Sequence, residues 1–373
     1  MGLSALVVDD SVIYRKAIVK ILEGSGSVSL VRQASNGKEA LRMFQENPSD
    51  LVTLDIEMPL MTGLEALPLL IQIKPDVKVL MVSSLTVKAA TVTMECLNLG
   101  ATDFITKEQA FGLRDDQEAA LGVNLRDKLA LMMSICKKDI ISRMSALELP
   151  TSSSKTILPL DERAHSSPSI SRFQSKKSAI SLLLVGSSTG GPQTLQEVFK
   201  QMQSHRNYGV VVVQHMPPVF TAQLAQNLQK VTGHLFVEAS EGLIVEKNMI
   251  VIAKGGFHLE LIKDQGHWLC HLTQTEPVNS CRPSVDVTFK SVAQQIHSSE
   301  VIAVMLTGMG ADGAQGCKAL SEKGVCIITQ EKSSCIVYGM PKAVDDLGIA
   351  TSHAKPTFII PEIEKFMLSP QLS

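Results

Sequence analysis

The stretch VIAVMLTGMGADGAQG, residues 301–316, joins a run of apolar and β-branched residues to a glycine-rich turn. An apolar run without polar alternation is typical of a parallel strand that is covered on both faces. Similar short runs recur along the chain and alternate with helical spacing of apolar residues. They fall at 5–10, 28–34, 51–56, 77–84 and 102–107, and then at 181–186, 209–215, 249–253 and 325–330. This alternation predicts an α/β protein with two doubly wound parallel sheets.

The glycine loop itself allows two interpretations. Gly308, Gly310 and Gly313 spell G-x-G-x-x-G, and Glu331 lies downstream near the distance of a ribose-binding acid. That pattern is the fingerprint of a dinucleotide-binding turn. However, Asp312 lies inside the loop and places a negative charge where a pyrophosphate would sit. The second interpretation is that the loop presents Asp312 as a functional carboxylate.

Composition and charge narrow the class of protein. The chain has 373 residues, 45% of them hydrophobic and 19% charged, with a formal net charge of −2. This length suits two ordinary domains, and the charge balance does not indicate nucleic-acid binding. The start of the chain lacks a signal-peptide pattern and no apolar run is long enough for a membrane span. We therefore expect a cytoplasmic protein without direct membrane insertion, with its seven cysteines as reduced thiols.

One segment divides the chain. Residues 145–178 are rich in Ser, Pro, Thr and charged residues and lack apolar periodicity, which predicts a flexible linker. We expect a first domain over residues 1–125, with a closing helix that extends to about residue 144. We expect a second domain over residues 179–373.

Polar residues follow four strands of the first predicted sheet. Asp9 and Asp10 follow the first strand, Asp55 the third, Ser83 the fourth and Lys107 the fifth. The carboxyl ends of parallel strands meet at one edge of a sheet, where ligands bind. Oxygen ligands suit Mg²⁺, and an Asp beside that ion can accept a phosphoryl group. The sequence therefore predicts a phosphoryl-accepting site in which the ammonium and the hydroxyl contact the phosphoryl oxygens.

The motifs VDDS, LDIEMP, MVSS and DFITK occur in this order within residues 1–125, which resemble a response-regulator receiver domain. The resemblance implies a flavodoxin-like fold and phosphorylation of Asp55 by a sensor histidine kinase of the chemotaxis system. It also implies Mg²⁺ held by Asp9, Asp10 and Asp55. Phe104 matches the aromatic switch position that couples to Ser83 and Lys107. Glu108 departs from the family, whose members usually carry Pro after the lysine.

In the second domain, LLLVGSSTGGP contains G-x-S-x-G with Ser188 at its centre, where a tight turn would expose a nucleophile. GVVVVQHMPP places His215 just after another buried strand, as a candidate base. Asp312, Asp286 and Glu331 are the candidate acids that would orient this base, and Asp312 is favoured because it directly follows a strand. A carboxylate there would accept the His215 Nδ1–H, and the loop glycines would aim backbone N–H groups at an oxyanion.

The motifs GSSTGGP, QHMPP, CRPSVDVTF, LTGMGADGAQG and YGMPKAV make residues 179–368 similar to the catalytic domain of the CheB family of chemotaxis protein-glutamate methylesterases. The resemblance implies a Rossmann-like domain, the triad Ser188, His215 and Asp312, and the Met309 N–H as an oxyanion donor. It implies no cofactor in this domain. Mild departures are residue 187, where Ala is common, residue 219, where Gly is common, and residue 254, where Pro is frequent.

The reaction implied by the family is hydrolysis of glutamate γ-methyl esters on methyl-accepting chemoreceptors, with deamidation of receptor glutamines as a related activity. The family also implies that the unphosphorylated receiver covers the active-site cleft. Two alternatives remain open from the residues. One is a receiver-controlled oxidoreductase that holds NAD in the 308–313 loop, which would leave Ser188 and His215 without a role. The other is a non-enzymatic output module that only binds a partner.

Overall fold

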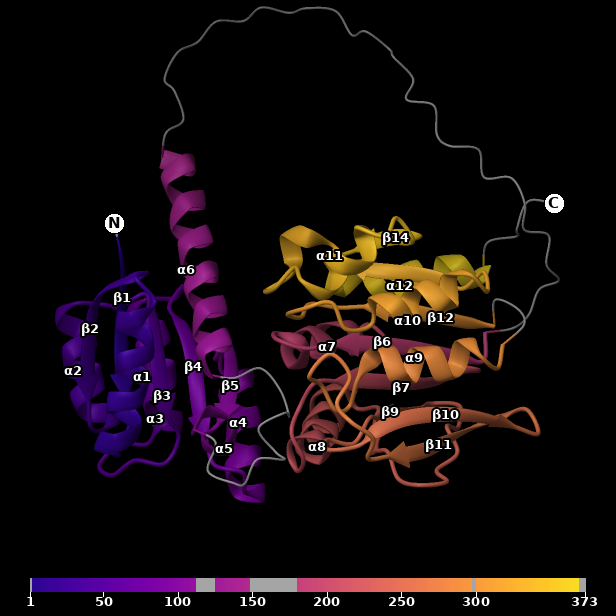
Figure 1. Cartoon of the computed structure of the whole chain (residues 1–373), viewed down its shortest axis with the longest axis horizontal. Helices are drawn as coiled ribbons and strands as arrows, with labels where there is room; N and C mark the ends of the chain where they lie inside the picture. Colours follow the sequence, from indigo (N-terminus) through magenta and orange to yellow (C-terminus); the bar gives the residue numbers. More distant parts are fainter. Residues whose placement is uncertain (1, 112–124, 148–179, 297–299, 369–373) are drawn as a thin grey trace, which may run out of the picture.

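The computed structural model describes residues 2–111, 125–147, 180–296 and 300–368 and forms two parallel-sheet α/β domains. The predicted fold class is therefore confirmed (Figure 1). Helices cover both faces of each sheet, which is why the strand sequences are almost continuously apolar rather than alternating.

The first domain is a five-stranded sheet in the order β2-β1-β3-β4-β5, which is the flavodoxin-like order. All of its strand pairs are parallel. Its elements are β1 (Leu3–Val8), α1 (Val12–Gly24), β2 (Val28–Ala34), α2 (Gly37–Glu46), β3 (Leu51–Asp55), α3 (Gly63–Ile73), β4 (Lys78–Ser83), α4 (Val87–Asn98), β5 (Asp103–Thr106), α5 (Lys107–Phe111) and α6 (Leu125–Leu147).

The second domain is built on a seven-stranded parallel sheet in the order β14-β13-β12-β6-β7-β9-β8. Its elements are β6 (Leu182–Ser187), α7 (Gly191–Phe199), β7 (Gly209–Gln214), α8 (Phe220–Thr232), β8 (Leu235–Glu238), β9 (Met249–Ile252), β10 (His258–Asp264), β11 (His267–Thr273), α9 (Val285–Ala293), β12 (Val301–Met305), α10 (Ala314–Ser321), β13 (Cys326–Gln330), η1 (Lys332–Ser334), α11 (Met340–Asp345), β14 (Ser352–Ala354) and α12 (Pro356–Leu368).

The order of the second sheet fixes where its site lies. The first strand, β6, is central, and the chain proceeds from it to β7 on one side and later to β12 on the other. Ligands of open α/β sheets bind outside the carboxyl ends of the strands at such a reversal. Ser188, His215 and the 308–313 loop follow the three adjacent strands β6, β7 and β12. The topology therefore brings together residues that are remote in the sequence, such as His215 and Asp312, which are 97 positions apart.

The antiparallel hairpin β10–β11 is an element that the strand analysis missed. Its signal is a two-residue turn, because Gln265 and Gly266 both adopt positive φ, of 46° and 85°. Two such residues between apolar segments form the type I′ turn that suits the twist of a hairpin. Leu259 and Leu261 of β10 are fully buried and belong to the same apolar cluster as Phe289 of α9.

The structure also bears on the predicted domain boundary and on the predicted absence of a membrane span. Helix α6 extends to Leu147, and the predicted linker from residue 148 onward lies outside the described residues. No helix in the described part of the chain combines the length and apolar character that crossing a membrane requires.

Candidate active site

Ser188 lies in the turn between β6 and α7, at the amino end of the helix. Gly190 adopts a left-handed φ of 76° and precedes the first residue of α7. At Gly191 a Cβ atom would lie 1.9 Å from Oε1 of Gln214, so only glycine fits. The Gln214 amide in turn donates to the Ser188 carbonyl at 2.9 Å. These contacts hold the serine at the carboxyl end of the sheet.

The 308–313 loop runs directly past this serine. A Cβ atom on Gly308 would lie 2.9 Å from the Ser188 Cβ and 2.2 Å from Sδ of Met340. Gly308 is therefore required for close approach of two backbones. The adjacent Met309 N–H has no acceptor among the described residues, and this residue is half-buried. An unpaired amide beside the serine is the arrangement that an oxyanion hole needs.

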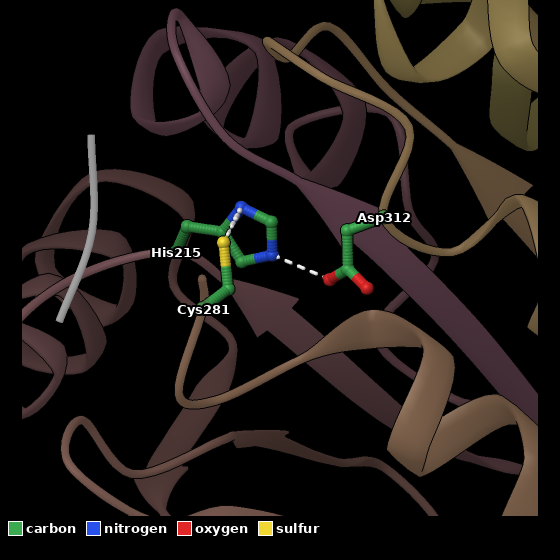
Figure 2. A group of neighbouring side chains, drawn as sticks. All are labelled: His215, Cys281 and Asp312. Atoms are coloured by element: carbon green, nitrogen blue, oxygen red, sulfur yellow. Dashed lines mark hydrogen bonds and ion pairs between the residues drawn. The ribbon is translucent and has the colours of Figure 1, made fainter. Parts of the chain in front are cut away.

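His215 and Asp312 form a hydrogen bond of 2.7 Å between Nε2 and Oδ2, shown in Figure 2. A carboxylate cannot donate, so Nε2 carries the proton and Nδ1 is the nitrogen left to act as a base. The arrangement predicted from the sequence, with Nδ1 facing the acid, is wrong. Because His215 follows β7 and Asp312 follows β12, the ring reaches across the end of the central strand β6.

Asp312 is a buried carboxylate surrounded by donors. Besides the His215 ring, it accepts hydrogen bonds from the Asn279 amide at 2.8 Å and the Ser284 hydroxyl at 2.7 Å. The backbone N–H groups of Val285 and Asp286, in the first turn of α9, also donate to it, at 2.6 and 3.3 Å. Burial acts to raise its pKa, but the hydrogen bonds and the positive charge of His215 lower the pKa to about 2. The group is therefore a permanent anion held at a helix amino end.

Cys281 is a site residue that sequence reasoning missed. Its Sγ lies 3.5 Å from Nδ1 of His215, and Asp312 contacts the other ring nitrogen, Nε2 (Figure 2). A tight turn places the thiol there, because Cys281 and Val278 exchange backbone hydrogen bonds. The sequence showed Cys281 only as the first residue of the CRPSVDVTF motif. No spacing rule connects it with a histidine 66 residues away.

The surroundings of His215 act on its pKa in opposite directions. Burial would lower the pKa of the imidazole, whereas the nearby Cys281 sulfur and the hydrogen bond to Asp312 raise it. The raising contributions prevail, and the pKa reaches about 10. Within the described residues the Ser188 hydroxyl makes no hydrogen bond to His215, so the ring contacts the thiol and not the serine in this state.

The other two candidate acids serve elsewhere. The Asp286 side chain accepts from the Gly316 N–H at 2.6 Å and from Asn279 at 3.1 Å, so it links α9 to α10. Glu331 is half-buried in the turn after β13 and accepts from the hydroxyl of Ser333. Among the three candidates it is Asp312 that bonds to His215.

The first domain gathers its predicted site residues at the carboxyl edge of its sheet. Lys107 Nζ lies 2.8 Å from Oδ2 of Asp55 and 3.3 Å from Oδ2 of Asp9. Carboxylate oxygens of Asp9, Asp10 and Asp55 lie within 4.8 Å of one another. Burial is the main reason that the pKa of Asp55 rises to about 6, and burial likewise raises the pKa of Asp9. The Asp9 Oδ2 atom is buried, and the Lys107 ammonium at 3.3 Å is the positive group beside it.

The switch positions are also defined. Ser83 is fully buried and its hydroxyl accepts from Thr93 of α4 at 2.9 Å. Phe104 is nearly buried and stacks on Phe220 of the second domain, with ring centroids 4.6 Å apart. Glu108, which replaces the usual Pro, accepts from the Leu85 N–H at 3.3 Å. Lys107 still reaches Asp55, so this replacement leaves the lysine in contact with the acid.

Comparison with known protein families gives two matches. The model described as "CheB methylesterase" matches residues 183–363, and the model described as "Response regulator receiver domain" matches residues 5–113. A protein from Thermotoga maritima named "Protein-glutamate methylesterase/protein-glutamine glutaminase" is 35% identical over 96% of each chain. A protein of the same name from Desulfotalea psychrophila is 37% identical and covers 93% of this chain and 94% of its own.

A solved structure, the CheB methylesterase catalytic domain of Thermotoga maritima, is also similar to this chain. The two are 35% identical, and the match covers 51% of this chain and all of that domain with a TM-score of 0.49.

We expect Asp312→Asn to reduce kcat by roughly 10³–10⁴-fold, because an amide lets the imidazole adopt the wrong tautomer. Hydrolysis of a methyl-esterified peptide, followed by methanol release, measures the loss. Asp286→Asn is the matched control, since it changes an acid of the same loop cluster that does not contact His215. A rate for Asp312→Asn within about tenfold of the unmodified chain would contradict the role of this carboxylate.

The raised pKa of His215 predicts a pH dependence. Only the neutral ring can accept a proton, so kcat/KM should rise about tenfold per pH unit below the pKa of the base. Cys281→Ala removes one contribution that raises this pKa, so the acidic limb of the profile should move to lower pH. The profile is measured with the non-enzymatic ester hydrolysis subtracted. An unmoved limb would mean that the sulfur does not act on the base.

Proposed function

The chain belongs to the CheB family of receiver-regulated protein-glutamate methylesterases/protein-glutamine glutaminases, and on this premise we propose which residues carry its reaction and its control. The enzyme hydrolyses glutamate γ-methyl esters and glutamine amides of proteins under regulation by its receiver domain. The domain limits that we propose are 1–125 for the receiver, with a closing helix to about residue 144, then a linker over 145–178 and the catalytic domain over 179–373.

We propose that Ser188 is the nucleophile, His215 the base and Asp312 the orienting acid. The Ser188 oxygen attacks the γ-carbonyl carbon of the substrate while Nδ1 of His215 takes the hydroxyl proton. His215 then returns this proton to the leaving methoxide or amide, which departs as methanol or ammonia. Water hydrolyses the acyl-enzyme by the same proton transfers. The Met309 N–H donates to the carbonyl oxygen as it gains negative charge.

The observation that carries this proposal is the contact between His215 and Asp312 at the carboxyl end of the central strands. The acid has its donors and its low pKa before any substrate binds, so it is ready to stabilise the imidazolium that forms in the transition state. Ser188 can give its proton to Nδ1 only after the contact between the Cys281 thiol and Nδ1 is broken. A rotation of the His215 or Ser188 side chain is therefore part of the proposed reaction.

We propose that the substrates are the methylated helices of methyl-accepting chemoreceptors, and that a sensor histidine kinase of the chemotaxis system supplies the phosphoryl group. The match to methylesterases supports the chemoreceptor substrate, and the match to receiver domains supports the kinase partner. A cytoplasmic location follows from this proposal, because both partners present their reactive groups there.

We propose Asp55 as the acceptor of the phosphoryl group. An Asp55 carboxylate oxygen attacks the phosphorus of the kinase phosphohistidine, the P–N bond breaks, and the kinase imidazole leaves. Lys107 pairs with the phosphoryl oxygens after it leaves its present ion pair with Asp55. Asp9, Asp10 and Asp55 would supply the hard oxygen ligands that Mg²⁺ takes. Bound Mg²⁺ would neutralise part of the phosphoryl charge.

We propose that phosphorylation acts through the contact between the two domains. Helix α4 lies against α8 and α7, where Thr91 bonds to Gln223 at 2.8 Å and Asn98 to Asn227 at 2.9 Å. Gln193, five residues after the proposed nucleophile, donates to the Ala101 carbonyl at 2.8 Å. Side chains near both Ser188 and His215 are thus in contact with the receiver.

The aromatic stack adds a direct link to the switch. Phe220 begins α8 five residues after His215, and Val219 before it adopts a positive φ of 74° that favours glycine. Ser83 contacts Thr93 of the same helix α4 that docks on α8. A phosphoryl group on Asp55 that draws Ser83 inward would move α4 and Phe104 and so weaken the contact.

We expect Ser188→Ala to lose at least about 10³-fold in kcat while folding normally, because it removes only the nucleophile. Ser187→Ala is the matched control, since the neighbouring serine is buried and bonds to Gln214 instead. Methanol release from methylated receptor measures both. Residual activity of Ser188→Ala that disappears on adding Cys281→Ala would assign the nucleophile to the thiol and overturn this proposal.

We expect acetyl phosphate with Mg²⁺ to stimulate the unmodified chain and to leave Asp55→Asn at its basal rate. The reason is that an amide cannot form the acyl phosphate. Asp76→Asn, in the turn before β4, makes the same chemical change away from the acidic cluster and should retain stimulation. Phosphodonor stimulation that survives in Asp55→Asn would place the acceptor on another residue.

A further inference from the structure

Cys281 has no part in the reaction proposed above, yet its thiol contacts Nδ1 of His215, the nitrogen that accepts the proton in that reaction. Its Sγ is 3.5 Å from Nδ1 of His215, and both residues are only half-buried. Cys281, His215 and Asp312 offer a sulfur, a nitrogen and an oxygen within 4.8 Å of one another. Thiolate and imidazole are the ligands that zinc prefers in proteins.

The spacing of the two inner ligands suits a tetrahedral ion. Zn–S bonds are about 2.3 Å and Zn–N bonds about 2.05 Å long, so a tetrahedral angle puts sulfur and nitrogen roughly 3.6 Å apart. The observed separation is 3.5 Å. An ion bound at Nδ1 in the plane of the ring could therefore take this sulfur as a second ligand after a rotation of the Cys281 side chain.

The carboxylate completes the arrangement from the other side of the ring. Histidines that bind metal almost always donate their second ring N–H to a carboxylate or carbonyl, which fixes the tautomer and makes the free nitrogen a better ligand. Here Nε2–H donates to Asp312 at 2.7 Å, which leaves Nδ1 as the available ligand atom, with the Cys281 sulfur 3.5 Å from it (Figure 2). The contact that prepares His215 as a base therefore also prepares it as a ligand.

We propose that Cys281 and His215 form an inhibitory binding site for Zn²⁺ or another thiophilic divalent cation, with Asp312 as the orienting partner of the histidine. Binding releases the thiol proton to solvent, forms a metal–sulfur bond and a metal–Nδ1 bond, and changes no oxidation state. Solvent fills the remaining coordination positions. The bound ion occupies the lone pair that must accept the Ser188 proton, so hydrolysis stops until a chelator removes the ion.

This inference deepens the regulation of the proposed active site and rests on His215 being its base. Its metal-binding part can nevertheless be tested without activity. Co²⁺ added to the full chain should give a near-ultraviolet thiolate-to-metal absorption band, and Ser188→Ala should give the same band. A chain that shows the band but no esterase activity would refute the proposed function and leave the metal site intact.

The decisive comparison is Cys281→Ser against Cys326→Ser, with excess Mg²⁺ present so that the receiver acids do not retain the added ion. Cys326 is also only partly buried but lies on β13, away from His215. We expect the band to vanish in Cys281→Ser alone. The Zn²⁺ concentration for half-inhibition, relative to each variant's own metal-free rate, should rise at least about tenfold there, because even indirect partners of a metal contribute 10–100-fold.

A third measurement uses the unmodified chain and so does not depend on how the variants fold. Zn²⁺ should protect Cys281 from iodoacetamide, detected by mass spectrometry of its peptide, and EDTA should restore both alkylation and activity. Equal zinc inhibition of Cys281→Ser and the unmodified chain would overturn the proposal, as would a cobalt band that depends on another cysteine.

Discussion

The second domain is organised around one buried negative charge. Asp312 is 2% exposed, and a carboxylate at that depth is stable only if donors replace the water that it loses. Those donors come from four parts of the chain: the 279 turn, Ser284, the first turn of α9 and the ring of His215. The need to solvate Asp312 therefore positions the helix, the turn and the base together.

The hydrogen bond to Asp312 also explains why His215 could serve both as a base and as a metal ligand. Asp312 accepts from Nε2 of His215, so in the neutral ring it is Nδ1 that carries the lone pair. A serine proton, a thiol proton and a thiophilic cation all compete for that lone pair. The turn between Val278 and Cys281 places the thiol 3.5 Å from Nδ1. The proposed base is therefore in contact with a group other than the proposed nucleophile.

Contact between the domains is suited to a reversible inhibitor. It consists of side-chain amides and hydroxyls with one aromatic stack, and each such interaction contributes about 1 kcal/mol net. These interactions together contribute a few kcal/mol to the association of the two domains, and the charge added by the proposed phosphorylation of Asp55 can offset that amount. The stack joins Phe104, at the proposed switch position of the receiver, to Phe220, at the start of the helix that follows His215. In the proposed mechanism this stack connects the receiver with the segment that follows the proposed base.

The sequence by itself determined the architecture and the strand ends at which the proposed site residues lie. Short apolar runs that alternate with helical spacing predict parallel strands covered on both faces, and the polar residues after such strands gather at one sheet edge. The positions of Ser188, His215, Asp312 and the receiver acids were therefore predictable, and their chemical roles stay proposals. Tertiary structure decided what depends on side-chain orientation and on contacts between distant segments. It selected Asp312 over Asp286, turned Nε2 rather than Nδ1 to the acid, and brought Cys281 to the base. A one-dimensional pattern specifies where a residue lies along a strand, but ring rotation and turn geometry are set by packing of segments that are remote in the chain.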